Sequence, residues 1–423
     1  MQSILPFLKI LFNLISVPLV IEGIISVCYL KIIANYLNFL RIKYRLKSTQ
    51  VLSQITEQIH DSEIGDILEN SLQGKRPTYD DCNRLLNSDN VSLMGLVAGV
   101  LTRKKFGKRA SFVNNIILNY TNVCITDCKF CAFYRPPDHK ESYTLTLDEI
   151  ESRVKTACDL FKIRQVLIQG GHNPNLGIEY YEDSFGMIRK KFPQVGVHGL
   201  STSEIDMIAK VENSSTKEIL SRLKDAGLQS LPGAGAEILT DQVKQIISPK
   251  KITSDDWLRI IEEAHILGIP ASATMMYGHV ESNQDIAEHF EKIVKLQLKT
   301  NGFMAFIPWS FEPNNTQMQK EGTVSFGAGG FQLLKMIAIS RLVFDGLIPH
   351  IQSSWLTNGI GMAQLALQYG ADDFGGTLIG EEVVSCTGAR STELTSKKII
   401  DSIHQIGFEV EERDNFYQTV CKY

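Results

Sequence analysis

The sequence predicts an α/β fold, a (β/α)8-type TIM barrel preceded by a helical N-terminal segment. From residue 112 onward, short apolar runs alternate with longer amphipathic segments, and the pair repeats about eight times over roughly 300 residues. Strand–helix repeats of this kind form a parallel sheet, and eight of them close it into a barrel. Polar and glycine-rich stretches follow the apolar runs, which is where such barrels carry their active residues.

The first 110 residues do not share this alternation. Apolar residues recur at helical spacing at Leu52, Ile55 and Ile59, and Gly74–Pro77 interrupts the pattern before a second helical stretch. We therefore expect four parts: an apolar N-terminal extension (1–48), a helical pre-barrel segment (49–110), the barrel core (111–345) and a C-terminal part that completes the barrel (346–423).

Within the barrel, each apolar run predicts a strand and each amphipathic segment a helix. The predicted strands are Asn115–Leu118, Gln165–Ile168, Val195–His198, Ser230–Leu231, Ala271–Met275, Phe303–Ile307, His350–Gln352 and Asp373–Phe374. The predicted helices are Leu147–Leu160, Tyr180–Lys191, Ser214–Ala226, Ser254–Leu267, Gln284–Lys299, Phe331–Asp345, Gly359–Tyr369 and Ser396–Ile406. The patterns of the fourth and eighth strands are the weakest.

Composition excludes several classes of protein. Of the 423 residues, 43% are hydrophobic and 21% are charged, which is ordinary for a globular protein and excludes disordered and fibrous chains. The net charge is −4, with 43 Lys and Arg against 47 Asp and Glu. No basic excess is present to neutralise phosphates, so we expect no nucleic-acid partner.

The N-terminus is unusually apolar. Residues 1–40 carry only three charged side chains, and residues 8–30, as a helix rising about 1.5 Å per residue, would cover about 34 Å of a hydrocarbon core about 30 Å thick. The basic residues that follow would keep the remainder in the cytoplasm: Arg41, Lys43, Arg45 and Lys47. We therefore expect a cytoplasmic protein with membrane contact through residues 8–30. A helix packed on the body and a translated upstream stretch are the alternatives.

Three of the eight cysteines crowd into the loop after the first predicted strand. Cys124, Cys128 and Cys131 have the spacing C-x3-C-x2-C, which arises by chance in about 0.003 sequences of this composition. Clustered cysteines in a long chain without a cleavable signal indicate metal ligands in a reducing compartment. Three thiolates can hold three irons of a cubane cluster and leave the fourth iron open to a small molecule. Zinc with His139 as a fourth ligand and buried structural cysteines are the alternatives.

Further candidate residues follow the next strands. Gly170 and Gly171 permit close backbone approach, by a ligand or by a tight turn. After the third strand, Ser201 is a candidate ligand-binding residue or, with Glu204, a helix-capping box. After the fourth strand, Glu237 follows small residues and could accept hydrogen bonds from a ligand or favour a helix N-terminus.

Two more segments have chemical content. His279 and Glu281 follow the fifth strand, where a His–Glu pair could move protons, although a lone His is more often only hydrogen-bonded. Trp309 and Phe311 follow the sixth strand and could wall a pocket for an aromatic or sugar-bearing substrate, or serve only in packing.

The pattern C-x3-C-x-aromatic-C at the end of the first barrel strand resembles the signature of the radical S-adenosylmethionine (radical SAM) superfamily. The resemblance implies one [4Fe–4S] cluster on Cys124, Cys128 and Cys131, with the open iron chelated by S-adenosylmethionine. It implies that Phe130 lies beside the adenine. Gly170 and Gly171, with Ser201 and Glu237, are then the predicted cofactor-binding residues. The cofactor supplies a 5′-deoxyadenosyl radical, and the protein supplies ligation, orientation and exclusion of water.

From about residue 50 to residue 415, the chain resembles the cyclic dehypoxanthinyl futalosine synthase family, a group of oxidoreductases in the futalosine route of menaquinone biosynthesis. The motifs that carry this resemblance are Asn119–Cys124, Cys131–Arg135, Gln169–Pro174, Leu231–Leu239, Met275–Glu281 and Phe306–Trp309. Relatives with the same barrel and cysteine motif are aminofutalosine synthase, deazaflavin (F420 precursor) synthase and the tyrosine lyase of thiamine synthesis. A cluster-bearing electron carrier or a non-catalytic barrel is the non-enzyme alternative.

The resemblance implies a reaction on dehypoxanthine futalosine, a small-molecule substrate. The adenosyl radical removes the ribose C4′ hydrogen, the sugar radical attacks the benzoate ring, and the ring then loses one electron and one proton. We predict His279 as the catalytic base with Glu281 beside it. Arg135 and Arg341 are candidates for pairing the substrate carboxylate. The family also implies an electron donor such as flavodoxin or ferredoxin.

Overall fold

The computed structural model describes residues 54–389 and 393–423. The chain divides into two units, Met1–Ser62 and Glu63–Tyr423. In the first unit only residues 54–62 are described, and residues 54–60 are helical. The predicted N-terminal extension, residues 1–48, lies outside the described residues.

The prediction of membrane contact is wrong for the residues that the structure describes. None of the helices in residues 54–389 and 393–423 has the length and the apolar character to cross a membrane. A spanning helix needs about 20 mostly apolar residues, whereas the longest described helix, α12 (Asn283–Thr300), is amphipathic and carries several charged side chains. Residues 8–30, on which the expectation rested, lie outside the described ranges.

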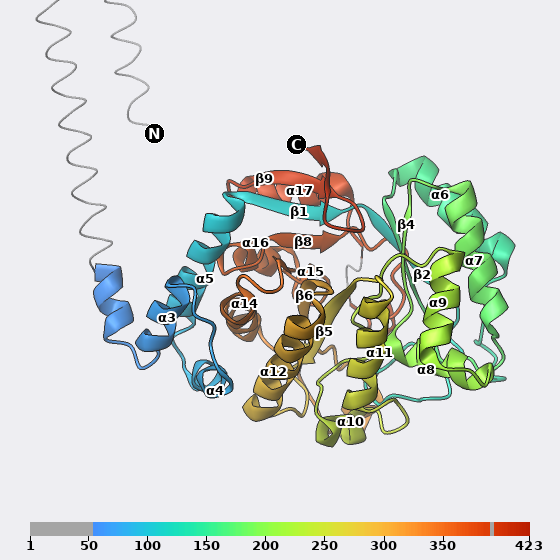
Figure 1. The fold of residues 1–423 in the computed structure, drawn as a ribbon, viewed down its shortest axis with the longest axis horizontal. Helices are drawn as coiled ribbons and strands as arrows, with labels where there is room; N and C mark the ends of the chain where they lie inside the picture. Colours follow the sequence, from blue (N-terminus) through green and yellow to red (C-terminus); the bar gives the residue numbers. More distant parts are fainter. Residues whose placement is uncertain (1–53, 390–392) are drawn as a thin grey trace, which may run out of the picture. The chain divides into compact units, whose positions relative to one another are not determined.

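Seven strands and one pair of residues form the inner ring of a barrel (Figure 1). The ring strands are β2 (Asn115–Asn119), β3 (Gln165–Gln169), β4 (Gly196–Gly199), β5 (Ala271–Tyr277), β6 (Phe303–Ser310), β7 (His350–Ile351) and β8 (Asp373–Gly376). Ser230 and Leu231 join β4 to β5 through single parallel bridges, which explains why this predicted strand has so weak a pattern. The predicted α/β-barrel fold class is confirmed.

Every neighbouring pair in the ring is parallel. β2 and β3 pair over five residues, from Asn115 with Gln165 to Asn119 with Gln169. The ring closes through two single bridges, Gln352 with Asp373 and Ile116 with Ile379. Because all strands run the same way, the loops that follow them gather at one end of the barrel.

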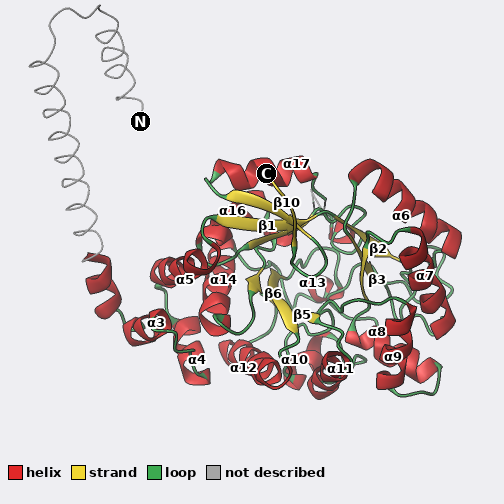
Figure 2. Cartoon of the chain, turned by 45° about the horizontal axis from the view of Figure 1, so that its top comes forward, coloured by secondary structure: helices red, strands yellow, loops and turns green. Residues whose placement is uncertain are grey.

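Helices cover the outside of the ring (Figure 2). The predicted helices are found with ends shifted by at most two residues: α6 (Leu147–Phe161), α7 (Ile178–Lys191), α9 (Thr216–Ala226), α11 (Ser254–Ile266), α12, α14 (Gly330–Phe344), α16 (Ile360–Gln368) and α17 (Ser396–Gln405). Side-chain caps determine where several of these helices begin. Thr146, for example, forms a capping box with Glu149 at the start of α6. Helices that the pattern did not predict are α8 (Thr202–Val211), α10 (Asp241–Ile247), α13 (Gln317–Lys320) and α15 (Trp355–Asn358).

Three helices precede the barrel in the second unit: α3 (Gly65–Leu72), α4 (Tyr79–Asn87) and α5 (Val91–Phe106). Helix α5 packs on α14 and α16. A Cβ atom on Gly95 would lie 2.1 Å from the Tyr369 ring, so the glycine permits the close approach of α5 to the end of α16.

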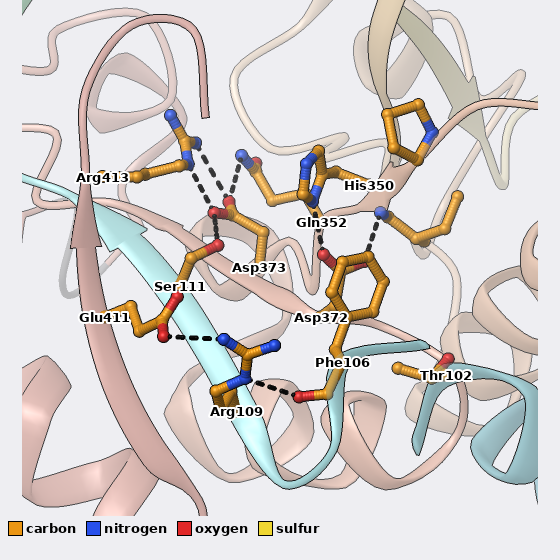
Figure 3. Close-up of polar contacts among 12 residues, drawn as sticks. Thr102, Phe106, Arg109, Ser111, His350, Gln352, Asp372, Asp373, Glu411 and Arg413 are labelled. Atoms are coloured by element: carbon orange, nitrogen blue, oxygen red, sulfur yellow. Dashed lines mark hydrogen bonds and ion pairs between the residues drawn. The ribbon is translucent and has the colours of Figure 1, made fainter. Parts of the chain in front are cut away.

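The C-terminal strands belong to a sheet that includes strand β8 of the ring. β9 (Glu409–Arg413) pairs in parallel with β1 (Arg109–Val113), which also pairs with β8, and β10 (Thr419–Lys422) extends this sheet. Arg413 donates to both carboxylate oxygens of Asp373 at 2.6 and 3.1 Å, and Ser111 donates to the same carboxylate (Figure 3). The C-terminal segment is therefore bound into the barrel wall by buried polar contacts.

Candidate active site

The cysteine loop begins where β2 ends. Backbone hydrogen bonds from Cys124 to the Arg135 carbonyl (2.9 Å) and from Arg135 to the Asn122 carbonyl (2.7 Å) close the loop at its base. Inside it, the Cys131 amide donates to the Cys128 carbonyl at 3.0 Å, and Asp127 adopts a left-handed conformation with φ of 39°. The loop therefore folds back on itself and draws its cysteines together.

The three cysteines are free thiols in a sheltered position. Cys124 and Cys128 are buried and Cys131 is half-buried. Burial raises the pKa of Cys128 to about 12; Lys251 opposes this rise, while Cys131 and Cys124 add to it. The pKa of Cys131 is also raised, chiefly by burial and in part by Cys124. The thiols therefore lie within electrostatic range of one another.

The fit to a cubane cluster follows from the donor set. Three sulfur donors on one loop are the ligands that iron–sulfur clusters take, and metal binding removes the thiol protons that burial otherwise favours. In residues 54–389 and 393–423, no group of three or more His, Cys, Asp or Glu side chains could hold a metal ion. In a cubane each thiolate binds a different iron, so its ligands lie further apart than those of one ion.

A histidine that the sequence analysis did not single out supports this loop. Thr126 Oγ1 lies 2.8 Å from Cys124 Sγ and 3.1 Å from Nδ1 of His172. Burial lowers the pKa of His172 to about 3, with a smaller contribution from Lys251, so the imidazole is neutral near pH 7. His172 directly follows the two glycines after β3, and this adjacency was the one signal available for it.

The two glycines are required by contacts with the loop after β2. A Cβ atom on Gly170 would lie 2.7 Å from the Tyr120 ring, and one on Gly171 would lie 2.2 Å from the Val123 carbonyl oxygen. The Gly171 amide donates to the Thr121 carbonyl at 2.8 Å. The structure thus brings the glycine turn against the start of the cysteine loop, as close backbone packing requires.

Ser201 and Glu204 form a capping box at the start of α8. One carboxylate oxygen of Glu204 accepts from the Ser201 amide at 2.6 Å, and the other accepts from the Tyr120 hydroxyl at 2.8 Å and the Gly170 amide at 3.0 Å. Burial raises the pKa of this carboxyl. Glu204 therefore ties the loops after β2, β3 and β4 together.

Glu237 lies between two lysines that the sequence analysis missed. Its carboxylate is 2.8 Å from Lys251 Nζ and 3.3 Å from Lys244 Nζ, and the two lysine side chains are only 11% and 3% exposed. Burial alone would raise the pKa of Glu237, but Lys251 and Lys244 outweigh it and lower this pKa to about 2. No periodic pattern in the sequence marks either lysine.

The end of α10 and the segment after it contact the cysteine loop. The Lys129 amide donates to the Ile247 carbonyl at 2.9 Å, and Lys250 pairs with Asp127 at 2.7 Å. Lys251 Nζ lies 5.4 Å from the centre of the Phe130 ring. The structure therefore brings two predicted site residues, Phe130 and Glu237, into one neighbourhood through Lys251.

His279 and Glu281 lie side by side after β5. His279 Nδ1 is 3.0 Å from a Glu281 carboxylate oxygen and accepts from the Val280 amide at 2.8 Å, while Nε2 is 3.1 Å from the Met276 carbonyl oxygen. Glu281 also accepts from the amides of Gly278 and His279. Both ring nitrogens thus have partners, one in the loop and one at the end of β5.

The barrel interior holds a cavity of about 90 Å³, lined by residues that include Gln165, His198, Ser272 and Ile307. Trp309 is two residues beyond Ile307 on the same strand and is half-buried, so it lies on the same interior face. Phe311 is buried and packs edge-on against His279. The cavity is therefore lined by both polar and apolar side chains.

Both arginines considered for the substrate carboxylate already have partners. Arg341 is fully buried and pairs with Asp372 at 2.5 Å. Arg135 pairs with Glu141 at 2.8 Å and donates to three backbone carbonyls of its own loop.

Comparisons with known proteins agree with this geometry. Residues 118–293 match the Radical SAM superfamily, and residues 300–422 match the CofH/MqnC C-terminal region. The fold is similar to that of methylornithine synthase (PylB), with a TM-score of 0.62, 17% identity and coverage of 81% of this chain and 96% of that one. It is also similar to HydG, a maturase of the [FeFe]-hydrogenase, with a TM-score of 0.66, 16% identity and coverage of 86% and 79%.

Curated relatives are more similar in sequence. Cyclic dehypoxanthine futalosine synthase of Streptomyces coelicolor is 38% identical over 363 residues, covering 84% of this chain and 89% of that enzyme. A 5-amino-6-(D-ribitylamino)uracil–L-tyrosine 4-hydroxyphenyl transferase of Methanopyrus kandleri is 38% identical over 321 residues, covering 76% and 87%. Aminodeoxyfutalosine synthase of Thermus thermophilus is 33% identical over 363 residues, covering 86% and 97%.

The radical SAM superfamily implies a [4Fe–4S] cluster and S-adenosylmethionine, and the donor set of the cysteine loop fits such a cluster. With two family regions that together span most of the barrel, and with relatives matched over most of their length, this chain belongs to the radical SAM superfamily and is a radical SAM enzyme.

Proposed function

We propose that this enzyme converts dehypoxanthine futalosine to cyclic dehypoxanthine futalosine in menaquinone biosynthesis. The observation that carries the proposal is the 38% identity to the Streptomyces enzyme of that name, which extends over 84% of this chain. The motifs that resemble this family lie in or just after the carboxyl-terminal parts of barrel strands, at the end where such barrels perform their chemistry.

In this proposal, Cys124, Cys128 and Cys131 hold the cluster and leave one iron for S-adenosylmethionine. When bound, the cluster and S-adenosylmethionine together supply the 5′-deoxyadenosyl radical. The burial of Cys124 and Cys128 supports the assignment, because it restricts the access of water to a reactive site. The side chains of Ser201 and Glu204 bond to each other's backbone amides in the capping box. We therefore assign these two residues to holding the surrounding loops in place.

Removal of the proton from the ring in the last step is assigned to His279, with Glu281 as its orienting partner. The pair lies in one loop at the carboxyl end of β5, with Nδ1 of His279 3.0 Å from the carboxylate. Both ring nitrogens of His279 already have partners. A role as the base therefore requires that one of these contacts opens when substrate binds.

The transferase reaction is the second candidate function. The Methanopyrus enzyme is equally identical to this chain, at 38%, over 76% of it. That enzyme joins a tyrosine-derived group to 5-amino-6-(D-ribitylamino)uracil, as its name states, so its substrates are chemically distinct from dehypoxanthine futalosine. The two activities can therefore be separated by supplying their substrates one at a time.

The test uses anaerobically reconstituted, reduced protein with S-adenosylmethionine. Dehypoxanthine futalosine, the substrates of aminodeoxyfutalosine synthase, and tyrosine with 5-amino-6-(D-ribitylamino)uracil are supplied in separate reactions. We expect 5′-deoxyadenosine and a cyclised product only with the first. Turnover with another set in place of the first would overturn the proposed substrate.

Variants of the cysteines test the ligand set in the same preparation. Changing Cys124, Cys128 or Cys131 to Ala should abolish 5′-deoxyadenosine formation and the brown colour of the cluster. Cys158, a half-buried cysteine on α6, is the matched control, and its change to Ala should preserve both. A triple variant that still binds about four irons per chain would contradict the assignment.

A further inference from the structure

A buried cation lies beside the cysteine loop, and the roles assigned above do not use it. The side chain of Lys251 is 11% exposed, and lysine is seldom buried unless it is paired. Its ammonium lies 2.8 Å from Glu237 and 5.4 Å from the centre of the Phe130 ring. Because Phe130 stands between Cys128 and Cys131 in the sequence, the ammonium lies next to the part of the loop that carries these two cysteines.

The side chains around Lys251 have a net positive charge. Glu237 is shared between Lys251 and Lys244, and its pKa of about 2 means that it is ionised near pH 7. Burial alone would lower the pKa of Lys251, but Glu237 and Cys128 outweigh it and raise this pKa. Burial lowers the pKa of Lys244, and Glu237 opposes this fall. With both lysines protonated, one carboxylate faces two ammonium groups, and one positive charge is left over within a buried group.

The thiols lie within range of these charges. The Cys128 sulfur lies within electrostatic range of both Lys251 and Glu237, whose charges act on it in opposite directions. Lys251 also interacts electrostatically with Cys124. Water screens little in such a buried place, so one charge here acts more strongly on the loop than it would at the surface.

We propose that Lys251, opposed by Glu237, determines how readily the iron–sulfur cluster accepts an electron. This inference rests on the proposed function, because it needs Cys124, Cys128 and Cys131 to be the ligands. A cluster core bound by three thiolates is anionic, and one added electron makes it more so without making or breaking a bond. A fixed cation nearby stabilises the more negative state and raises the reduction potential, which cluster surroundings are known to tune.

The experiment measures the midpoint reduction potential of the cluster in the reconstituted full-length protein without S-adenosylmethionine, with dithionite as the one-electron donor. Lys251→Met should lower the ratio of reduced to oxidised cluster at a fixed potential by about tenfold or more. Lys251→Arg keeps the charge and should stay within about twofold of the unchanged protein. Glu237→Gln removes the opposing charge and should raise the ratio.

Lys250 provides a matched control. It is the neighbouring lysine and contacts the same loop through Asp127 at 2.7 Å, but its side chain is 59% exposed. Lys250→Met removes the same charge from a place where water and salt screen it, so the ratio should change by less than about twofold. Equal shifts in the Lys250 and Lys251 variants would overturn the proposal.

Iron content separates this proposal from the one on which it rests. Iron retained by the cysteine variants would show that the ligand set is wrong, and both proposals would fall. The other outcome is that the cysteine variants lose their iron. If Lys251→Met then keeps its iron and its reduction potential is unchanged, only the role of Lys251 is overturned. Weaker binding of S-adenosylmethionine at an unchanged potential would make Lys251 a cosubstrate ligand and would also overturn it. If Lys251→Met does not fold, Glu237→Gln decides, and a potential that does not rise contradicts the proposal.

Discussion

His279 shows how far a residue's contacts narrow its chemistry. In the sequence it is a histidine two positions before a glutamate, and both residues could move protons. In the structure, each ring nitrogen has a backbone partner close by in the chain: Nε2 lies 3.1 Å from the Met276 carbonyl oxygen, and Nδ1 accepts from the Val280 amide. A role as the base and a role in holding the loop can then be distinguished by experiment, because the base acts only after hydrogen abstraction.

If His279 is the base, His279→Ala should still form 5′-deoxyadenosine when substrate is supplied. It should form far less cyclised product, since a positioned base contributes about 10²–10⁴-fold in rate. The measurement is the ratio of cyclised product to 5′-deoxyadenosine, with His404→Ala on the exposed face of α17 as the control. An unchanged ratio, with both outputs reduced together, would remove His279 from proton transfer and leave it a role in holding the loop.

At the scale of elements, strand β9 is held by two ion pairs of different burial (Figure 3). Arg413 and Asp373 are 2.6 Å apart, and their side chains are 4% and 0% exposed. Arg109 and Glu411 are 3.0 Å apart, but the arginine is 42% exposed. The same strand therefore contains a buried pair and a matched pair near the surface.

Arg413→Leu should cost about 3–5 kcal/mol in the free energy of unfolding, because it leaves the Asp373 carboxylate buried without its counter-charge. Arg109→Leu should cost at most about 1 kcal/mol, because water already solvates much of that pair. Urea unfolding of the two variants measures both values. Similar losses for the two changes would contradict this account of how the C-terminal strand is attached.

Across the described residues, four histidines, three buried and one half-buried, are held in their neutral form near pH 7. Burial is the largest cause in each case, and the pKa values are lowered to about 3 for His172, His198 and His289 and to about 4 for His265. The unfolded chain binds protons at these histidines near pH 6.5, whereas the folded chain does not until the pH is much lower. Glu237 acts in the same direction at lower pH, and Glu204, whose pKa burial raises, acts in the opposite direction.

The free energy of unfolding should therefore fall as the pH falls from about 7.5 to about 5.5. The expected loss is about 1.4 kcal/mol for each histidine that stays neutral in the folded state. Urea unfolding at several pH values measures the slope. His265→Gln, on α11, should reduce the slope of the free energy of unfolding against pH by the contribution of one histidine. A free energy of unfolding that is constant or increases on acidification would contradict the prediction.

The sequence alone determined the order of the barrel elements and the cysteine loop. Strands such as Gln165–Gln169 and helices such as Leu147–Phe161 have periodic patterns within a few residues, and the spacing of Cys124, Cys128 and Cys131 is itself local. Even the two-residue segment Ser230–Leu231 was found, because the repeat required a strand there. These features depend on residues that are neighbours in the chain, so one sequence is enough to predict them.

Tertiary structure decided the contacts between distant segments. Arg109 and Glu411, 302 positions apart, come together because β1 pairs with β9. The sequence of neither strand predicts that it pairs with the other. Lys251 reaches the Phe130 ring, and His172 reaches Thr126, only because separate loops meet at the same end of the barrel. Burial and charge at the site arise from that meeting, and therefore the electrostatic surroundings of the cysteines became visible only in the folded protein.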